Sequence, residues 1–140
     1  MSDAPALRRV LETALYVEDL AAARAFYVDT LGARVLLDTQ RLLALDVSGA
    51  SVLLLFQRGA TSEPLPTPGG VVPPHGASGS QHVAFAIDAD ALDAWREHLG
   101  ASGVVIESEV RWPRGGTSLY VRDPAGHSVE FVTPGLWKTY

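Results

Sequence analysis

The spacing of apolar and polar residues along the chain predicts short strands interrupted by two helices. Leu11–Val17, read as LETALYV, predicts the first strand. Ala21–Thr30 carries Ala, Phe and Tyr side chains at helical spacing, and Gly32 is a plausible helix stop. Three further strand-like runs follow, at Ala33–Thr39, Leu42–Val47 and Ser51–Gln57. The first part of the chain is therefore expected to have the order βαβββ.

The same order returns after Arg58–Ser80, a stretch that holds five prolines and five glycines and shows no periodicity. We expect this stretch to be a linker or long loop that either carries function or crosses between two halves. The elements predicted after it are a strand at Gln81–Ile87, a helix at Ala89–Ser102, and strands at Val104–Val110, Thr117–Arg122 and Ser128–Thr133. Asp123–Gly126 (DPAG) is a β-turn signal before the last strand.

A shift of 70 residues superposes the two halves, placing Glu12 on His82 and Val17 on Ile87. Internal repetition of this kind is the most informative feature of the chain. It predicts an α+β fold in which two βαβββ modules, residues 10–57 and 81–133, form a curved mixed sheet around a shared cavity. We expect residues 1–140 to make one such domain, with residues 58–80 as the crossover loop.

Alternation along the strands directs Glu12 and His82 to equivalent positions on the small-residue faces of their sheets. Glu130 shares a face of the last strand with Ser128 and Val132. Two carboxylates and an imidazole facing one cavity suit a divalent metal ion such as zinc, manganese, iron, cobalt or nickel. The alternative for each residue is an exposed side chain on a half-solvated sheet.

The amino-acid composition excludes some binding partners and some kinds of site. The chain has no cysteine, which excludes disulfides and thiolate ligands. Eleven basic against 16 acidic residues give a net charge of −5, which argues against nucleic acid as a partner. No apolar run is long enough to cross a membrane, and Met1–Arg9 lacks the pattern of a signal peptide. A cytoplasmic protein is expected.

Three segments, LETALYVEDLAAARAFYVDTLG, SGSQHVAFAI and SLYVRDPAGHSVEFV, resemble the vicinal oxygen chelate superfamily. That superfamily includes glyoxalase I, extradiol dioxygenases, fosfomycin-resistance thiol transferases and bleomycin-resistance proteins. The resemblance implies the glyoxalase-like fold, pairing of chains as a homodimer, and one divalent metal ion held by Glu12, His82 and Glu130. The fourth ligand of some members would fall on Leu53 or Leu54, so it is absent here.

The resemblance implies a metal-dependent enzyme acting by Lewis-acid chemistry on a small oxygen-chelating substrate, as an isomerase, lyase or dioxygenase. Glu12 stands where many members have His, and this favours the isomerase and lyase chemistries over ferrous dioxygenation. The alternative is a metal-free protein that binds a small molecule such as an antibiotic and confers resistance to it.

Further residues are assigned to the site. We expect Glu12, Glu130 and Tyr120 to act in catalysis, because a tyrosine ten residues before the last ligand faces the site in the thiol-transferase branch. Arg114, Ser118 and His75 are expected to contact the substrate. The remaining assignments are structural: His98 on a solvated helix face, His127 in a turn, and the aromatic residues Trp137 and Tyr140 docked on this chain or a partner.

Overall fold

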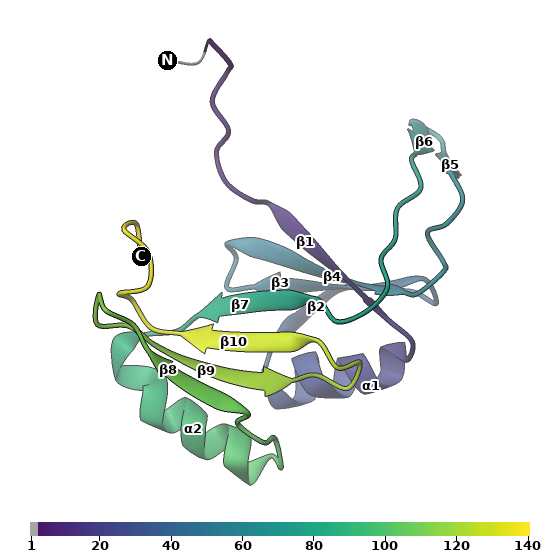
Figure 1. Cartoon of the computed structure of the whole chain (residues 1–140). Helices are drawn as coiled ribbons and strands as arrows, with labels where there is room; N and C mark the ends of the chain where they lie inside the picture. Colours follow the sequence, from purple (N-terminus) through teal and green to yellow (C-terminus); the bar gives the residue numbers. More distant parts are fainter. Residues whose placement is uncertain (1–2) are drawn as a thin grey trace. The chain divides into compact units, whose positions relative to one another are not determined.

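The computed structural model describes residues 3–140. Met1 and Ser2, the first residues of the segment in which no signal peptide was expected, lie outside the described residues. The described chain forms two units. One contains the residues up to Leu20 and Gly32–Ala77, and the other contains Ala21–Leu31 and Ser78–Tyr140. Each unit has a mixed four-stranded sheet (Figure 1). The predicted α+β class and the two βαβββ modules are confirmed.

The first sheet has the strand order β1-β4-β3-β2. The parallel pair β1·β4 lies at one side, and the other pairs are antiparallel. Its strands agree with the predicted ones to within a residue: β1 (Glu12–Val17), β2 (Arg34–Asp38), β3 (Leu42–Val47) and β4 (Ser51–Gln57). Alternate positions of this sheet carry its most buried aliphatic side chains, each at most 3% exposed: Leu15, Val17, Leu43, Leu45, Leu53 and Leu55.

The second sheet repeats this topology in the order β7-β10-β9-β8, again with one parallel pair, β7·β10. Its strands are β7 (His82–Ala86), β8 (Ser108–Arg111), β9 (Thr117–Arg122) and β10 (Ser128–Val132). One face is covered by α2 (Leu92–Ala101), which follows the short turn η2 (Ala89–Ala91) (Figure 1). The Trp95 ring stacks on Phe131 with centroids 4.9 Å apart, and Leu99 is fully buried, as the helix pattern predicted.

The first helix has two parts, α1 (Leu20–Arg24) and the π-helical segment η1 (Ala25–Thr30). Two hydrogen bonds tie η1 to the unit that contains the second sheet. The Tyr27 hydroxyl donates to Asp123 Oδ2 at 2.7 Å, and both residues are buried. The His98 Nε2 lies 2.6 Å from the carbonyl oxygen of Thr30, so this exposed histidine is not purely solvated.

Two predicted elements were wrong. The strand expected at Val104–Val110 begins only at Ser108, because the Val104 amide donates to Leu99 O at 2.8 Å and continues the end of α2. The loop Arg58–Ser80 is not free of strands: it contains the hairpin β5 (Leu65–Thr67) and β6 (Gly70–Val72). Strands of three residues are too short to show a period in the sequence.

The base of this hairpin arm is closed by His75. The amide of His75 donates to Thr61 O at 2.9 Å, and the buried Thr61 hydroxyl donates back to His75 O at 2.5 Å. The His75 ring packs edge-on to Phe56 at 4.8 Å, and its Nδ1 is hydrogen bonded to the Tyr16 hydroxyl at 2.5 Å. His75 therefore anchors the loop to the strand ends of its own sheet.

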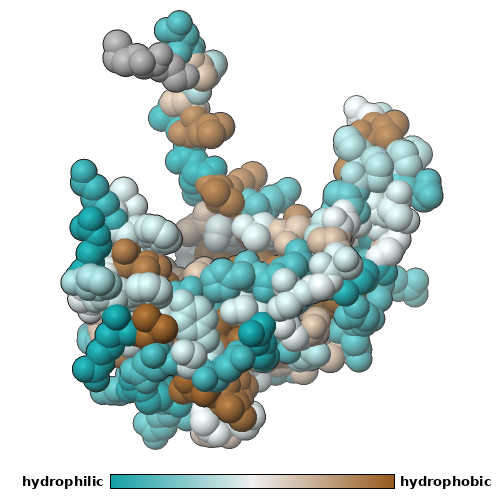
Figure 2. Space-filling view, viewed as in Figure 1, coloured by the Kyte–Doolittle hydropathy of each residue, from teal (hydrophilic) through white to brown (hydrophobic). Residues whose placement is uncertain are grey.

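Apolar side chains remain exposed at two extended segments of the first unit (Figure 2). They are Leu7, Val10 and Leu11 before β1, and Leu65, Val71 and Val72 on the hairpin arm. No helix in the described part of the chain is both long and apolar enough to span a membrane.

The C-terminal tail docks on the second sheet through one of its two aromatic residues. The Tyr140 hydroxyl donates to Val132 O at 2.9 Å and to Ile87 O at 3.1 Å. Trp137 is 69% exposed and makes no such anchor. The tail also passes close to the β8–β9 loop, because a Cβ built on Gly116 would lie 2.8 Å from the carbonyl carbon of Gly135.

Replacing Tyr27 by Phe should lower the free energy of unfolding at pH 7 by about 1.5–3 kcal/mol, because the buried Asp123 loses a hydrogen-bond donor. Burial and the Asp123 carboxylate raise the pKa of Tyr27 well above its ordinary value. The folded state therefore keeps this proton above pH 10 while the unfolded state loses it, so stability falls as pH rises.

The Tyr27→Phe variant has no Tyr27 proton to lose, so its stability lacks this dependence on pH. In urea unfolding at pH 7, 9 and 11, the unfolding free energies of the parent and the variant should therefore converge as pH rises. Trp137→Phe is the control at pH 7, expected within about 0.5 kcal/mol of the parent because Trp137 is 69% exposed. Equal unfolding free energies for Tyr27→Phe and the parent at pH 7 would contradict the account.

Replacing His75 by Ala should loosen the hairpin arm while leaving the sheet intact. Loss of the ring contacts and of the bond to Tyr16 is expected to speed amide hydrogen exchange of residues 61–75 about 2- to 10-fold. Peptide-resolved mass spectrometry measures this. His98→Ala, in the other unit, is the control and should leave the arm's exchange unchanged, and equal rates in both variants would rule out the anchoring role.

Candidate functional site

His82 and Glu130 meet on one face of the second sheet. His82 is the first residue of β7 and pairs with Ser128, while Glu130 lies two residues further along the neighbouring β10. His82 Nε2 is 3.2 Å from Glu130 Oε1. The imidazole is half exposed (51%), whereas the Glu130 side chain is almost fully buried (5%). The parallel pairing thus brings two of the three predicted metal ligands together.

The His82 ring is held in one orientation by the adjacent strand. Its Nδ1 is 3.0 Å from the carbonyl oxygen of Ser128. A carbonyl oxygen only accepts, so Nδ1 carries a proton in this bond and Nε2 is the nitrogen directed at Glu130. The Tyr120 ring lies alongside, inclined by 26° to the imidazole with centroids 6.3 Å apart.

Glu130 is oriented by a chain of two donors. The hydroxyl of Ser118, which is fully buried on β9, donates to Glu130 Oε2. The Trp112 indole Nε1 in turn donates to Ser118 Oγ at 2.7 Å. Ser118, predicted to contact substrate, thus contacts Glu130. Trp112 was assigned no role from the sequence, where it reads as one residue of a loop.

Tyr120 pairs with Glu130 across β9 and β10. Partial burial, and next the negative charge of Glu130, raise the pKa of Tyr120 above its ordinary value. The phenol consequently stays protonated over the physiological range, where it can donate a hydrogen bond to a bound oxygen. This behaviour is compatible with the catalytic role predicted for it.

Glu12 belongs to the first unit, where it is the exposed first residue of β1. The register shows which residue of the first sheet is equivalent to Glu130: Leu54 pairs with Ala14 just as Glu130 pairs with Ala84. Among residues 3–140, no three His, Asp or Glu side chains gather into a group that could hold a metal ion.

Two further residues were predicted to contact the substrate. Arg114 is exposed in the turn between β8 and β9, and His75 is bound to Tyr16 in the first unit. His127 is not a simple turn residue: it is fully buried, and its Nδ1 accepts a hydrogen bond from the Gln81 amide at 2.9 Å. It thereby holds the residue that precedes His82.

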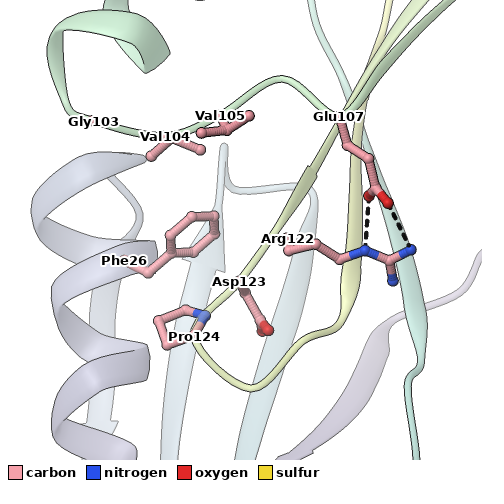
Figure 3. A pocket seen from close by; sticks show the side chains of 8 residues that line it. All are labelled: Phe26, Gly103, Val104, Val105, Glu107, Arg122, Asp123 and Pro124. Atoms are coloured by element: carbon pink, nitrogen blue, oxygen red, sulfur yellow. Dashed lines mark hydrogen bonds and ion pairs between the residues drawn. The ribbon is translucent and has the colours of Figure 1, made fainter.

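The second unit also has an open pocket of about 490 Å³ (Figure 3). The Arg122–Glu107 ion pair, 2.8 Å at its closest, crosses one side of it. Its lining is otherwise mostly apolar: Phe26, Gly103, Val104, Val105, Asp123 and Pro124. None of the residues predicted for the active site lines this pocket.

The chemistry available at His82 and Glu130 is that of an imidazole nitrogen and a carboxylate oxygen held side by side. Together they can share a proton or bind a cation. Each is oriented by a hydrogen bond at its other polar atom, which is typical of residues that ligate a metal.

Known proteins share this fold. A solved lactoylglutathione lyase from Agrobacterium tumefaciens is 38% identical, with a TM-score of 0.84 over 93% of this chain and 96% of that one. The metallothiol transferase FosB of Lysinibacillus sphaericus (strain C3-41) is 30% identical over 122 residues, 86% of this chain and 78% of that protein. An integron cassette protein from the Halifax Harbour sewage outfall metagenome is 26% identical, with a TM-score of 0.72 over 91% of this chain and 99% of that one.

A family model also matches residues 9–131. Its span includes Glu12, His82 and Glu130 and covers both sheets except for Val132, the last residue of β10. The chain belongs to the Glyoxalase/Bleomycin resistance protein/Dioxygenase superfamily, as its resemblance to the vicinal oxygen chelate proteins implied.

Proposed function

We propose that this protein is a divalent-metal-dependent enzyme that acts on a small oxygen-chelating substrate, with lyase or isomerase chemistry. The observation that carries the proposal is the contact of His82 Nε2 with Glu130 Oε1 at 3.2 Å on a solvent-accessible sheet face. Glu12 is the third proposed ligand.

The residues present fit a metal ion. Two ligand atoms bound to one cation lie about 3 Å apart when each bond is about 2.0–2.2 Å long, and this is the separation seen between His82 and Glu130. The proton on His82 Nδ1 leaves Nε2 as the ligating atom, and Ser118 occupies the other oxygen of Glu130. When bound, the ion would supply Lewis-acid polarisation of the substrate oxygens.

The chain's own residues would bind and move protons around the substrate. The Tyr120 hydroxyl, kept protonated by burial and by Glu130, would donate to an oxygen that gains negative charge. Glu12, exposed at the start of β1, would take a proton from a carbon or hydroxyl next to that oxygen. Arg114 and His75 remain predicted substrate contacts.

The donor set and the relatives both favour lyase or isomerase chemistry over dioxygenation. One histidine with two carboxylates is a harder ligand set than the two histidines and one carboxylate of ferrous oxygenases. The 38% identity to a lactoylglutathione lyase supports the same reaction class. The likeness to a metallothiol transferase supports metal dependence.

Metal binding is the first test. Protein stripped with a chelator and dialysed should be stabilised by zinc, manganese, nickel or cobalt, by about 2.7 kcal/mol at 100 times the Kd. The melting shift should be larger at pH 7.5 than at pH 5.5, because protons compete with the metal for the imidazole and the carboxylates.

His82→Ala and Glu130→Gln should abolish the metal-dependent shift. His98→Ala and Glu97→Gln make the same chemical changes on α2 and serve as matched controls that should keep it. Elemental analysis gives the stoichiometry of each purified variant. A metal content that is unchanged in His82→Ala would show that these residues are not the ligands.

Whether the Glu12 of a site comes from the same chain or from the partner copy can be tested by combining two variants that each fail to bind metal. In the expected homodimer, Glu12 completes either the site of its own chain or that of its partner, and exchange between the copies is the case tested. Coexpressed Glu12→Gln and Glu130→Gln chains would then form heterodimers with one intact site, and about half of the parental metal content per dimer should return. If Glu12 acts within its own chain, every site in the heterodimer carries one defect and no binding returns.

The second candidate is a metal-free protein that binds a small molecule such as an antibiotic. It is favoured by the family, whose description includes bleomycin resistance proteins. Absence of any metal-dependent melting shift at either pH, in the stripped parent protein, would decide for this candidate.

A further inference from the structure

We propose that Trp112 is a positioning residue for Glu130 and acts through the hydroxyl of Ser118. The inference rests on the proposed metal-dependent function, which supplies the task for which Glu130 is positioned. The Trp112 indole nitrogen donates to Ser118 and not to Glu130, so this hydrogen bond acts on the site through Ser118.

Trp112, Ser118 and Glu130 form a chain of hydrogen bonds in which each donor points toward Glu130. The Trp112 indole N–H donates to Ser118 Oγ at 2.7 Å, and the Ser118 hydroxyl donates to Glu130 Oε2. An indole nitrogen can only donate, and a hydroxyl has a single proton. With Trp112 bound to its oxygen, Ser118 directs that proton at the carboxylate.

The consequence is that the two carboxylate oxygens of Glu130 are distinguished. Oε2 is occupied by Ser118, and Oε1 is left facing His82 Nε2 at 3.2 Å. A carboxylate held in this way would offer one oxygen to a metal ion. Ser118 is fully buried and Glu130 nearly so, and hydrogen bonds in such a medium polarise one another, so loss of the first donor weakens the second bond.

The surrounding backbone holds Trp112 in place. It directly follows β8, and its amide donates to Gly116 O at 2.8 Å across the turn to β9. Gly116 packs so tightly against Gly135 that a side chain at either position would overlap backbone atoms. The indole is thus carried on a rigid turn, as a residue that positions another must be.

If Trp112 acted only by packing, Trp112→Phe would leave the metal site unchanged. Phe fills most of the same volume and lacks only the N–H and part of the ring, so packing would survive the exchange. An effect of Trp112→Phe on the metal site would therefore have to come from the lost hydrogen bond. Ser118→Ala removes the middle of the chain with almost no change in volume and isolates the same interaction.

Cobalt(II) is the probe for the test, because its d–d absorption reports the number and arrangement of its ligands. Titrations of the stripped protein at pH 7.5 give both the Kd and the spectrum. We expect Ser118→Ala to weaken cobalt binding about 10- to 100-fold and Trp112→Phe about 3- to 10-fold, with shifted d–d bands in both. Trp137→Phe, on the exposed tail, and Ser108→Ala, exposed on β8, are the matched controls.

The double variant Trp112→Phe/Ser118→Ala should bind cobalt no more weakly than Ser118→Ala alone, because Trp112 acts only through Ser118. Melting temperatures and circular dichroism check that each variant is folded. Parental affinity and spectrum in both single variants would overturn the positioning role while leaving the metal site intact. Failure of the parent protein to bind cobalt would instead overturn the proposed function.

Discussion

The parallel pairing of β7 with β10 is the constraint on which the candidate site depends. It joins strands that lie 46 residues apart in the chain, since Ser128 pairs with His82. With this register, His82 and Glu130 share a face and their side chains touch. A slip by one residue would move Glu130 to the face that carries Phe131 under Trp95, where a carboxylate could not be accommodated.

The β7·β10 pairing buries the Glu130 carboxylate, which is energetically unfavourable unless hydrogen-bond donors surround it. A carboxylate that is 5% exposed needs donors, and the sheet supplies them from β9 and from the loop that leads into it. Ser118 and Trp112 meet this need and select which oxygen of Glu130 faces His82. The same polar chain that makes the buried charge tolerable therefore also arranges the site. Removing a member would affect both the stability of the fold and the geometry of the candidate site.

Comparison of the two modules shows how one topology can serve two purposes. Their strand orders are the same, and Leu54 occupies in β4 the position that Glu130 occupies in β10. The first sheet keeps Glu12 at its edge but has apolar residues where the second has its polar chain. Its equivalent region holds Tyr16, Phe56 and His75, which fasten the hairpin arm. The repeat thus preserves the fold while the polar residues of the site are concentrated in one half.

The sequence by itself determined the internal repeat, the α+β class and most of the strands. It also determined that Glu12 and His82 occupy equivalent positions of the two modules. It could do so because alternation and helical spacing are local properties that a core must satisfy. Alternation also predicted the shared face of His82 and Glu130. Only the tertiary structure decided that Trp112 and Ser118 orient Glu130, that His127 is buried, and that β5 and β6 exist. Hydrogen bonds between distant strands and strands of three residues leave no periodic trace in the sequence. The strand expected from Val104 failed for a related reason, because valines favour a strand locally and a single backbone bond to the end of α2 overrode that preference.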